Sequence, residues 1–593
     1  MKDIIRYGYT DHKDANHKGV NHKGADHKDT DHKDAGVSKE TVVKARTSVL
    51  SLLLALAMTV MLLLSSCGSA ASAGDAGTVT TTSVEYDAAS KAEMFTERDL
   101  SGDYDESEAE TITLSGSSAK TSASSGVSID GSTVTITAEG VYIVSGTLSD
   151  GQIIVDADDA AKVQIVLDGA SVTSGTSAAL YVKSADKVFV TTAAGTENTL
   201  ANGGSFTADG DTNVDGAVFA KDDITFNGSG SLAVDSPAGH GIVGKDDVKI
   251  AGGSVTVNAA NHGIQANDSV RVAEAAVVID AQAKDGIHVS DDADEEEGTE
   301  SDSFFYMADG SLSISAGDDG IHADAEALIE GGAIDITKSY ESIEALSIKV
   351  SGGDIKTAAT DDGFNAAGGN SSTGSKTFGS GDWQGGGMMN DGGSDGSIEI
   401  SGGNIYITAG GDGVDSNGSV TVSGGYTVIC GPSQGDTSVL DYNGSATITG
   451  GTFIGTGGAG MAESFSAAEQ GMIAVSVGNQ SAGSTVTLKD ADGKVIAEVT
   501  PELDYAVVYI STGDMAQGSS YELTAGSYSE SITLSDFMYS TLGGGRGGSF
   551  GGGGPRGGMN GEMKDGQNGG TDGGMNGEMN GGMHGGPGRG QIF

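Results

Sequence analysis

From about Thr111 onward, apolar and polar residues alternate in short runs such as STVTITA, QIIVDA and KVQIVLDG. Gly, Ser, Asp and Asn separate these runs, and these residue types favour turns. A period of two places successive side chains on opposite faces of a β-strand. No stretch after residue 100 shows a convincing helical period. The pattern therefore predicts an all-β protein built from short strands.

The alternating segments repeat with a period of about 22 residues, as expected of a solenoid. Two insertions, at 291–303 and 369–393, account for the two long intervals. A coil of this length has room for two or three strands but no helix, so we expect coils that stack at the strand spacing of about 4.8 Å. The predicted fold class is an all-β right-handed parallel β-helix, and an array of β-sandwiches is the alternative. Related segments begin at positions 215, 239, 261, 284, 318, 340, 361 and 411.

Each coil supplies one aligned apolar residue that we expect to point inward. A Gly-Gly pair precedes the next strand in several coils, where we expect a corner that requires a positive φ angle. The second glycines of these pairs are Gly253, Gly332, Gly353, Gly403 and Gly425. The aligned inward residues are Val218, Ile242, Ile264, Ile287, Ile321, Ile343, Phe364 and Val414.

The segments on either side of the repeat differ from it in composition. Residues 67–106 are rich in Ser, Thr, Ala and acidic residues, and we interpret them as a tether that precedes the β-helix at 107–465. Residues 466–541 predict a small antiparallel β module with the character of a β-sandwich. Residues 542–593 contain mainly Gly, Met and Asn without apolar periodicity, which predicts a disordered tail.

The segment 1–66 carries signals of export rather than of folding. Positions 11–35 repeat a pentad that contains His, which indicates either a metal-binding tract or translated sequence upstream of the true start. A basic segment, an apolar run at 49–64 and Leu-Ser-Ser-Cys follow. The tetrad resembles a bacterial lipobox, with Cys67 as the lipidated residue, and an uncleaved anchor or an ordinary signal peptide is the alternative. We expect an exported protein that acyl chains hold on the outer face of the bacterial membrane.

Charge narrows the possible partners. The chain has 83 Asp and Glu against 31 Lys and Arg, a net charge of −52 at pH 7. Nucleic acids are bound by clustered positive charge, so this composition argues against a nucleic-acid partner. Two Cys in 593 residues also exclude a disulfide framework.

Acidic residues recur at the corner that precedes the inward residue of successive coils. Stacking would bring these carboxylates to about 5 Å of one another, where bare charges repel. Ca²⁺ takes six to eight oxygen ligands and would neutralise them, whereas the scarcity of His and Cys there disfavours zinc. The alternative is a series of Asp-Gly turns on an acidic surface. The candidate metal ligands are Asp318, Asp319, Glu341, Glu344, Asp361, Asp362, Asn365 and Asp415.

Four histidines lie near the same edge. The spacing places His240 and His262 in a different column from His288 and His322. We interpret them as polar surface residues rather than as metal ligands.

The segments GDDGIHAD, TKSYESIEA and TDDGFNAAGG resemble those of secreted carbohydrate-binding domain proteins of cellulolytic bacteria. The β-helix of those proteins is similar to that of pectate-lyase-type polysaccharide lyases, and the resemblance extends over about 111–535. It implies calcium at the acidic positions, and binding of cellulose-like and acidic sugars such as polygalacturonate. The sequence departs from the pattern at Ser342, where we expect Gly. The acids that match the motifs are Asp318, Asp319, Glu341, Glu344, Asp361, Asp362 and Asn365.

Three hypotheses for function follow. The first is a non-catalytic binder in which calcium links the protein to acidic polysaccharide. The second is a calcium-dependent pectate-type lyase with Lys338 or Lys284 as the base. The third is a passive acidic adhesin or envelope spacer. Binding to crystalline cellulose is the weaker prediction, because no flat aromatic face is visible: Trp383 is the single Trp, and Tyr340, Phe364, Tyr406 and Tyr442 are equally compatible with packing.

Overall fold

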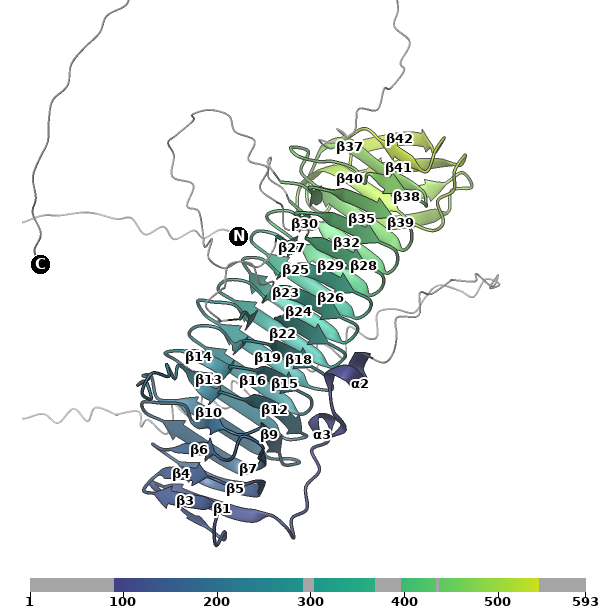
Figure 1. Ribbon diagram of the computed structural model, residues 1–593. Helices are drawn as coiled ribbons and strands as arrows, with labels where there is room; N and C mark the ends of the chain where they lie inside the picture. Colours follow the sequence, from purple (N-terminus) through teal and green to yellow (C-terminus); the bar gives the residue numbers. More distant parts are fainter. Residues whose placement is uncertain (1–89, 292–302, 368–395, 433–436, 543–593) are drawn as a thin grey trace, which may run out of the picture. The chain divides into compact units, whose positions relative to one another are not determined.

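A computed structural model describes residues 90–291, 303–367, 396–432 and 437–542 (Figure 1). Cys67, Trp383 and the histidine repeat at 11–35 lie outside the described residues, as do nearly all of the two insertions and of the predicted tail. The described part consists almost entirely of β-strands, which confirms the all-β prediction.

Of the described strands, 39 belong to one mixed sheet through which the chain winds coil after coil (Figure 1). Between coils the pairing is parallel. β11 (Gly216–Ala220), for example, pairs with β8 (Leu180–Ser184) of the preceding coil and β14 (His240–Gly244) of the following coil. Each coil thus adds one strand to each of three ladders of parallel strands, which we call ladders A, B and C.

The strands divide among the ladders as follows. Ladder A contains β4 (Thr133–Ile136), β6 (Gln152–Asp156), β8, β11, β14, β17 (Ile264–Ala266), β20 (Ile287–Val289), β27 (Phe364–Ala366), β30 (Val414–Ser416) and β33 (Leu440–Tyr442). Ladder B contains β9 (Lys187–Thr192), β12 (Asp223–Gly228), β15 (Asp247–Ile250), β18 (Ser269–Val272), β21 (Phe304–Met307), β28 (Ser397–Ile400), β31 (Ser419–Val422), β34 (Ser445–Ile448) and β36 (Ala467–Ala468). Ladder C contains β10 (Glu197–Asn202), β13 (Ser231–Ser236), β16 (Ser254–Ala259), β19 (Ala276–Ala281), β22 (Ser311–Ala316), β24 (Ala333–Ser339), β26 (Asp354–Ala359), β29 (Asn404–Thr408), β32 (Tyr426–Cys430) and β35 (Thr452–Gly457). Five longer strands run across two ladders: β1 (Glu110–Gly116), β5 (Gly140–Leu148), β7 (Lys162–Ser174), β23 (Ile321–Ile329) and β25 (Ile343–Val350).

The core is a stack of apolar side chains, one above another. All eight predicted inward residues are at most 1% exposed, and in ladder A they pair directly, as Ile264, Ile287 and Ile321 do. Complete burial of such a side chain is worth about 1.5–3 kcal/mol. A single coil cannot bury its own apolar face, so the core exists only through stacking.

The predicted corners are also confirmed. The second glycine of each Gly-Gly pair has a φ angle between +72° and +92°. At Gly425 an added Cβ would lie 2.5 Å from the carbonyl oxygen of Gly402 in the preceding coil. Neighbouring corners are therefore in backbone contact, and this contact fixes the register from one coil to the next.

Residues 90–100 differ from the predicted tether. They form two short helices, α2 (Ser90–Met94) and α3 (Glu97–Leu100), that pack on the coils. Phe95 is buried against Ala251 and Tyr306. Asp99 is fully buried and accepts hydrogen bonds from Lys187 Nζ at 2.7 Å and Thr225 Oγ1 at 2.8 Å. The Ser- and acid-rich composition concealed this contact, because its partners belong to later coils that are distant in the sequence.

Both ends of the described stack are covered by antiparallel strands. At the first coil, β2 (Ser118–Thr121) and β3 (Val127–Asp130) pair with β1 and β4. At the last coil, β40 (Tyr505–Ser511) pairs antiparallel with β35 and with β37 (Met472–Gln480), which is flanked by β43 (Met538–Ser540). A separate four-stranded antiparallel sheet consists of β38 (Val486–Asp490), β39 (Val495–Val499), β41 (Ser520–Ala525) and β42 (Tyr528–Thr533). The pairing of β2 and β3 at the first coil, and of β40 with β35 of ladder C at the last coil, protects these strand edges from pairing with other chains. No helix within the described ranges has the length and apolarity needed to cross a membrane.

Candidate functional site

Two adjoining columns of polar side chains run along ladder A. The corner column takes the residue two positions before each inward residue, and the strand column takes the residue one position after it. Backbone hydrogen bonds hold the corner column in register: Gly286 N–H donates to Asp319 O and Gly320 N–H to Glu341 O, both at 2.9 Å. The corner column contains His240, His262, Asp285, Asp319, Glu341, Asp362 and Asp412. The strand column contains Gln265, His288, His322, Glu344, Asn365, Asp415 and Asp441, which are successive register partners.

Glycine follows most corner-column residues for a steric reason. At Gly263 an added Cβ would lie 2.2 Å from Ile279 Cγ2 of ladder C. Ser342 is the departure noted in the sequence. Its coil carries Thr357 where the two coils that pair with it carry Ile336 and Ile407. The smaller Thr side chain leaves room for Ser342, so the corner keeps its geometry.

Several corner-column carboxylates accept, at one oxygen, a hydrogen bond from a backbone N–H of the next coil. Asp319 Oδ1 accepts a hydrogen bond from the Glu341 N–H at 2.9 Å. Asp362 Oδ1 accepts one from the Asp412 N–H at 2.5 Å, and Asp412 Oδ1 accepts one from the Ser438 N–H. Each of these carboxylates therefore has a fixed position, and its second oxygen is left for another partner.

Asn365 links the two columns. Its Nδ2 donates to Glu341 Oε2 at 2.8 Å, and the side chain is only 7% exposed. Its Oδ1 accepts no hydrogen bond from any described residue. A buried carbonyl oxygen without a donor is costly, and such an atom usually has a water or an ion as its partner.

The carboxylates of this region resist ionisation. Burial, followed by the negative charges of Glu344 and Asp319, raises the pKa of Glu341 to about 9. Burial and the charge of Asp285 raise the pKa of Asp319 to about 8. Farther along, burial again is the main cause that raises the pKa of Asp362 to about 7 and that of Asp412 to about 8. These groups must either hold protons or share a cation near neutral pH.

Most predicted ligands come together in this region. Ligand atoms of Asp319, His322 and Glu344 lie within 4.8 Å of one another, and so do those of Asp362, Asp412 and Asp415. We call this part of the two columns the carboxylate end. It consists of Asp319, Glu341, Glu344, Asp362, Asn365, Asp412 and Asp415.

Two predicted residues occupy a flanking position. Asp318 and Asp361 lie one residue before the corner column. Carboxylate oxygens of Asp318, Asp285 and Asp319 nevertheless lie within 4.8 Å of one another. Sequence reasoning missed Asp285, Asp412 and Asp441. The first two were visible as the Asp of KDGIH and GDGVD, which align with the quoted DDGIH motif.

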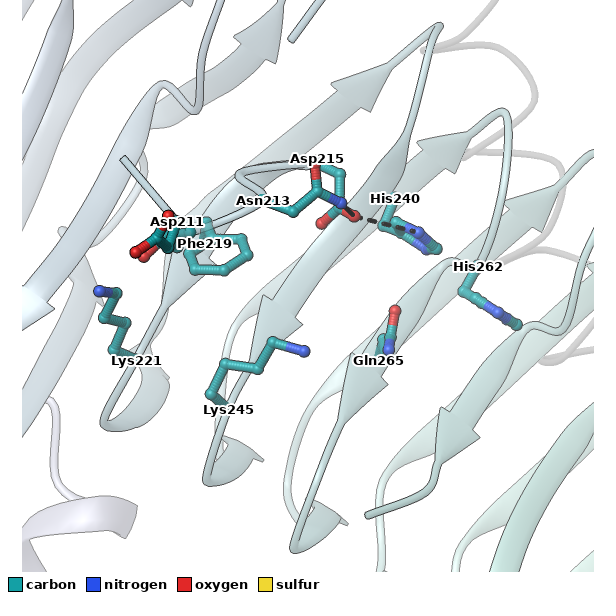
Figure 2. A pocket seen from close by; sticks show the side chains of 10 residues that line it. Asp211, Asn213, Asp215, Phe219, Lys221, His240, Lys245, His262 and Gln265 are labelled. Carbon is teal, nitrogen blue, oxygen red and sulfur yellow. Dashed lines mark hydrogen bonds and ion pairs between the residues drawn. The ribbon is translucent and has the colours of Figure 1, made fainter. Parts of the chain in front are cut away.

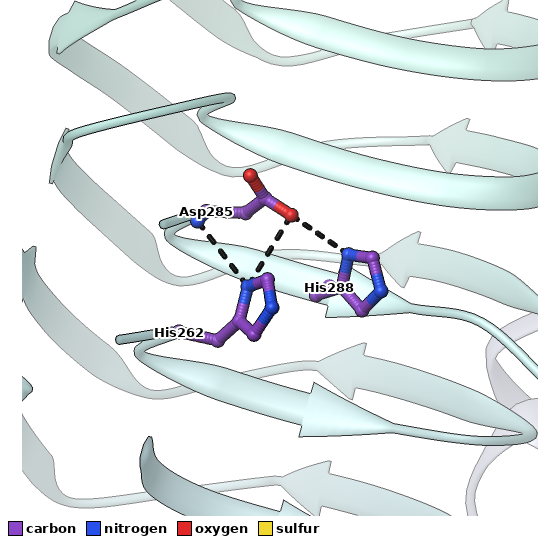
Figure 3. A group of neighbouring side chains, drawn as sticks. All are labelled: His262, Asp285 and His288. Carbon is purple, nitrogen blue, oxygen red and sulfur yellow. Dashed lines mark hydrogen bonds and ion pairs between the residues drawn. The ribbon is translucent and has the colours of Figure 1, made fainter. Parts of the chain in front are cut away.

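The opposite end of the columns is rich in histidine (Figure 3). Asp285 Oδ2 lies 2.7 Å from His288 Nδ1 and 3.3 Å from His262 Nδ1. The backbone N–H of Asp285 also donates to His262 Nδ1 at 3.2 Å. We call His240, His262, Asp285, His288 and His322 the histidine end.

The four imidazoles of this end form one continuous stack. Their ring centroids are 5.0, 4.3 and 4.9 Å apart from His240 to His322. The register does place His262 and His288 in different columns, as predicted, but the rings lean together around Asp285. Interpreting all four as surface residues was wrong for His322, which is 6% exposed, because the stack and its acidic partners cover it.

Charges at the histidine end are compensated. Burial opposes ionisation of Asp285, but its contacts with the imidazoles of His262 and His288 hold its pKa well below the usual range. Burial is the main cause that lowers the pKa of His262. Against burial, hydrogen bonds to Asp324 and Glu344 raise the pKa of His322, whose Nδ1 lies 2.7 Å from Glu344 Oε2.

The other residues considered from the sequence lie elsewhere. Phe364 is part of the core, and Tyr442 donates to Ser464 O at 2.8 Å. Tyr406 is 47% exposed on ladder C, away from the columns of ladder A, and its ring lies 6.0 Å from that of Tyr426. Tyr340 is 48% exposed. Of the two lysines proposed as a lyase base, Lys338 is exposed on β24 and Lys284 precedes Asp285.

Comparison with known proteins finds relatives whose names refer to carbohydrate binding. Residues 130–385 match the family model described as carbohydrate-binding domain-containing protein. A carbohydrate-binding domain-containing protein of Acetivibrio thermocellus is 39% identical over 136 residues, 23% of this chain and 48% of that protein, so the chain spans about half the length of the relative. A solved structure of the polysaccharide lyase-like protein from C. thermocellum, a gadolinium derivative, shares 31% identity over 42% of this chain and 95% of that chain, with a TM-score of 0.34. Through residues 130–385, which include most of both columns, this chain is similar to carbohydrate-binding domain proteins.

Proposed function

We propose that the protein is a non-catalytic, calcium-dependent binder of acidic polysaccharide. The carboxylate end would hold the calcium, and the ions would link the protein to the carboxylates of the sugar chain. The stack itself is proposed to be a right-handed parallel β-helix, a form that exposes a long continuous edge to a polymer.

One observation carries the proposal: Asn365 Oδ1 is buried without a hydrogen-bond donor among carboxylates that are fixed by the backbone. Ca²⁺ accepts carboxylate and amide oxygens together and tolerates irregular geometry. Asp319, Glu341, Glu344, Asp362 and Asn365 would supply such oxygens from three successive coils, and Asp412 and Asp415 would extend the set to a fourth. The residues present therefore fit the ion.

Calcium also resolves a difficulty of charge. A chain with a net charge of −52 repels a polyuronate. A bound divalent cation reverses the local charge and leaves coordination positions for ligands from outside the protein. Acidic sugars such as polygalacturonate suit this mechanism better than cellulose, because a neutral glucan offers no carboxylate to the ion.

The proposed location is the outer face of the bacterial membrane, where acyl chains on Cys67 would anchor the protein. It rests on the basic segment, the apolar run and the Leu-Ser-Ser-Cys tetrad. Incorporation of labelled palmitate, abolished by Cys67→Ala, is the result expected.

Sedimentation with insoluble pectin tests the main proposal. We expect tight binding in calcium, much weaker binding in EGTA, and weaker binding in calcium for Glu341→Gln combined with Asp362→Asn. Asp130→Asn combined with Glu139→Gln, at exposed sites of the first coils, controls for the change in net charge. Binding that EGTA leaves unchanged would contradict the bridging mechanism. Release of unsaturated sugar, detected by its ultraviolet absorbance, would instead show that the protein is a lyase. If the protein binds pectin under no condition, the passive adhesin or spacer is the function that remains.

A further inference from the structure

We propose that a pocket beside the histidine end is a second, calcium-independent subsite for a carboxylate-bearing sugar unit. The pocket has a volume of about 690 Å³ and lies on ladder A (Figure 2). Lys221, Lys245, Phe219, Asp215, His240 and Gln265 are among the residues that line it. The inference rests on the proposed function, since it names a second contact for the same class of polysaccharide.

The two lysines occupy equivalent positions in adjacent coils. Ala220 at the end of β11 pairs with Gly244 at the end of β14, so Lys221 and Lys245, the next residues, are neighbours along the stack. In the preceding coil the equivalent residue is Lys183, because Val182 pairs with Ala220. Three coils in succession thus carry a lysine at the same corner, about 4.8 Å apart by strand spacing.

This cluster of basic residues is notable in a chain with 83 acidic and 31 basic residues. Lys183 is already paired, since its Nζ lies 2.6 Å from Asp209 Oδ2. Lys221 is exposed and forms no ion pair within 4.0 Å with any described residue. An ammonium group available at the rim of a pocket is suited to receive an anion.

The rest of the pocket suits a sugar rather than a simple anion. Asn213 Nδ2 donates to Asp215 Oδ2 at 2.6 Å, and Asp215 lies 4.0 Å from His240 Nε2. These groups and Gln265 offer both donors and acceptors for hydroxyl groups. Asp211 and Asp215 would repel a small, fully charged anion such as phosphate, whereas the hydroxyl groups of a sugar donate to carboxylates.

The buried ring of Phe219 completes this pocket. It is 1% exposed and packs edge-on against Tyr181, with ring centroids 5.7 Å apart. The walls are therefore anchored to a packed cluster, which keeps the polar groups in fixed positions.

The pocket is continuous with the columns already described. Its lining includes His262, which also contacts Asp285 at the histidine end. In the corner column, the residue after Asp285 is Asp319 of the next coil, which is the first residue of the carboxylate end. A sugar chain that lies along the stack axis would reach the lysines at one end and the proposed calcium at the other, and every residue of a polyuronate carries a carboxylate for such contacts.

Calorimetric titration with trigalacturonate in excess EGTA and low salt tests the subsite. We expect the wild-type chain to bind, added salt to weaken the binding, and cellotriose, which has no carboxylate, not to bind. Lys221→Gln combined with Lys245→Gln should weaken binding at least tenfold, since charge-assisted hydrogen bonds are lost. Lys120→Gln combined with Lys162→Gln removes the same charge at exposed sites of the first coils and should bind like the wild type.

The outcomes separate the two proposals. Undiminished binding by the Lys221/Lys245 variant in EGTA, or binding of the wild type only when calcium is present, would overturn the subsite while leaving the calcium mechanism standing. Loss of calcium-dependent pectin binding in the Glu341/Asp362 variant, with trigalacturonate binding in EGTA retained, would support both. If trigalacturonate binds in neither EGTA nor calcium, both proposals fail. Circular dichroism of each variant verifies that it is folded.

Discussion

The two ends of the columns solve the same electrostatic problem in different ways. At the histidine end, the buried Asp285 carboxylate has two imidazole partners, and its pKa is lowered. At the carboxylate end, Glu341 has an amide partner and acidic neighbours, and its pKa is raised. The backbone is nearly the same in both regions, since both lie on ladder A with the same register.

The difference indicates where a cation is needed. A buried carboxylate beside imidazoles is compensated by the protein itself, because an imidazole N–H can donate a hydrogen bond to it. A buried carboxylate beside other carboxylates is stabilised only by a proton or by a metal ion. The sequence changes from His to Asp and Glu along both columns, so under the proposed calcium mechanism the two column residues of each coil determine where the ion is needed.

His322 marks the boundary between the two ends. It stacks on His288 on one side, and on the other its Nδ1 lies 2.7 Å from Glu344 Oε2. A metal at the Asp319, His322 and Glu344 cluster would compete with this ion pair. We therefore expect the Asp362, Asp412 and Asp415 cluster, which contains no imidazole, to bind calcium more tightly.

Removal of calcium should have the largest effect. One site stabilises the folded state by about 2.7 kcal/mol when calcium is 100 times its dissociation constant, and several sites add to this. We expect calcium to raise the melting temperature and EGTA to lower it, as measured by differential scanning calorimetry.

Variants at the two ends sharpen the same measurement. Asp362→Asn should reduce the calcium-induced rise in melting temperature, whereas Asp285→Asn should leave that rise unchanged. If both variants lose the calcium-induced rise in melting temperature equally, the two ends do not differ in calcium binding. If calcium does not raise the melting temperature of the wild-type chain, the calcium assignment is wrong.

The pH dependence of stability without calcium should differ between the ends. For Glu341, Asp319, Asp412 and Asp362 the folded pKa is raised, so their contribution is full below the unfolded value of about 4 and is lost as pH rises through about 7 to 9. For Asp285 the pKa is lowered, so its contribution is present above about 4 and is lost as pH falls.

Urea unfolding in EGTA from pH 2 to pH 9 would measure both limbs. We expect Glu341→Gln combined with Asp362→Asn to flatten the loss on the alkaline side, although His322, whose pKa is raised, adds a loss in the same direction. Asp285→Asn should flatten the loss on the acid side only. A wild-type stability that does not fall between pH 6 and pH 9 would contradict the raised pKa values.

Much of this arrangement could be predicted from the sequence. In a repeat of nearly constant length, the spacing between residues determines which position each residue occupies in its coil. The inward residues and the glycine corners follow from the nearly constant length of the coil, and the column positions of Asp319, Glu341 and Asp362 follow from the same count. Residue identity at aligned positions was sufficient to place them, since each coil sits directly on the previous one.

Other features depend on contacts between segments that the spacing of the repeat does not relate to each other. The helices at 90–100 contact ladder B through Asp99 and Lys187, a pair with no repeat to mark it. The stacking of His262 on His288 joins two columns, and it arises from side-chain directions around Asp285 rather than from register. The pocket beside Lys221 likewise combines corner residues with the 209–215 segment, which has no counterpart in the other coils.

Replacement of Asp285 itself should have an intermediate effect on stability. Asp285→Asn keeps the shape but removes the charge that His288 and His262 face at 2.7 and 3.3 Å. We expect a loss of about 1–3 kcal/mol in the free energy of unfolding at pH 6, the cost of leaving buried partners unpaired. Asp280→Asn, at an exposed site on β19, is a matched control. A loss no greater than that of the control would show that the histidine end is held by ring stacking alone.

The smallest effect is expected one residue away from the corner column. Asp318 and Asp319 are adjacent, but Asp319 accepts the Glu341 N–H and Asp318 occupies the more exposed flanking position. Asp318→Asn should therefore change the free energy of unfolding by no more than about 0.5 kcal/mol in calcium, as expected for a substitution outside the buried network. Asp319→Asn should lose much more of the calcium response in the same calorimetric measurement. Because the two variants carry the same change in net charge, a difference between them can come only from the position of the carboxylate, and equal effects would mean that calcium responds to the overall acidity of the corner rather than to a defined column.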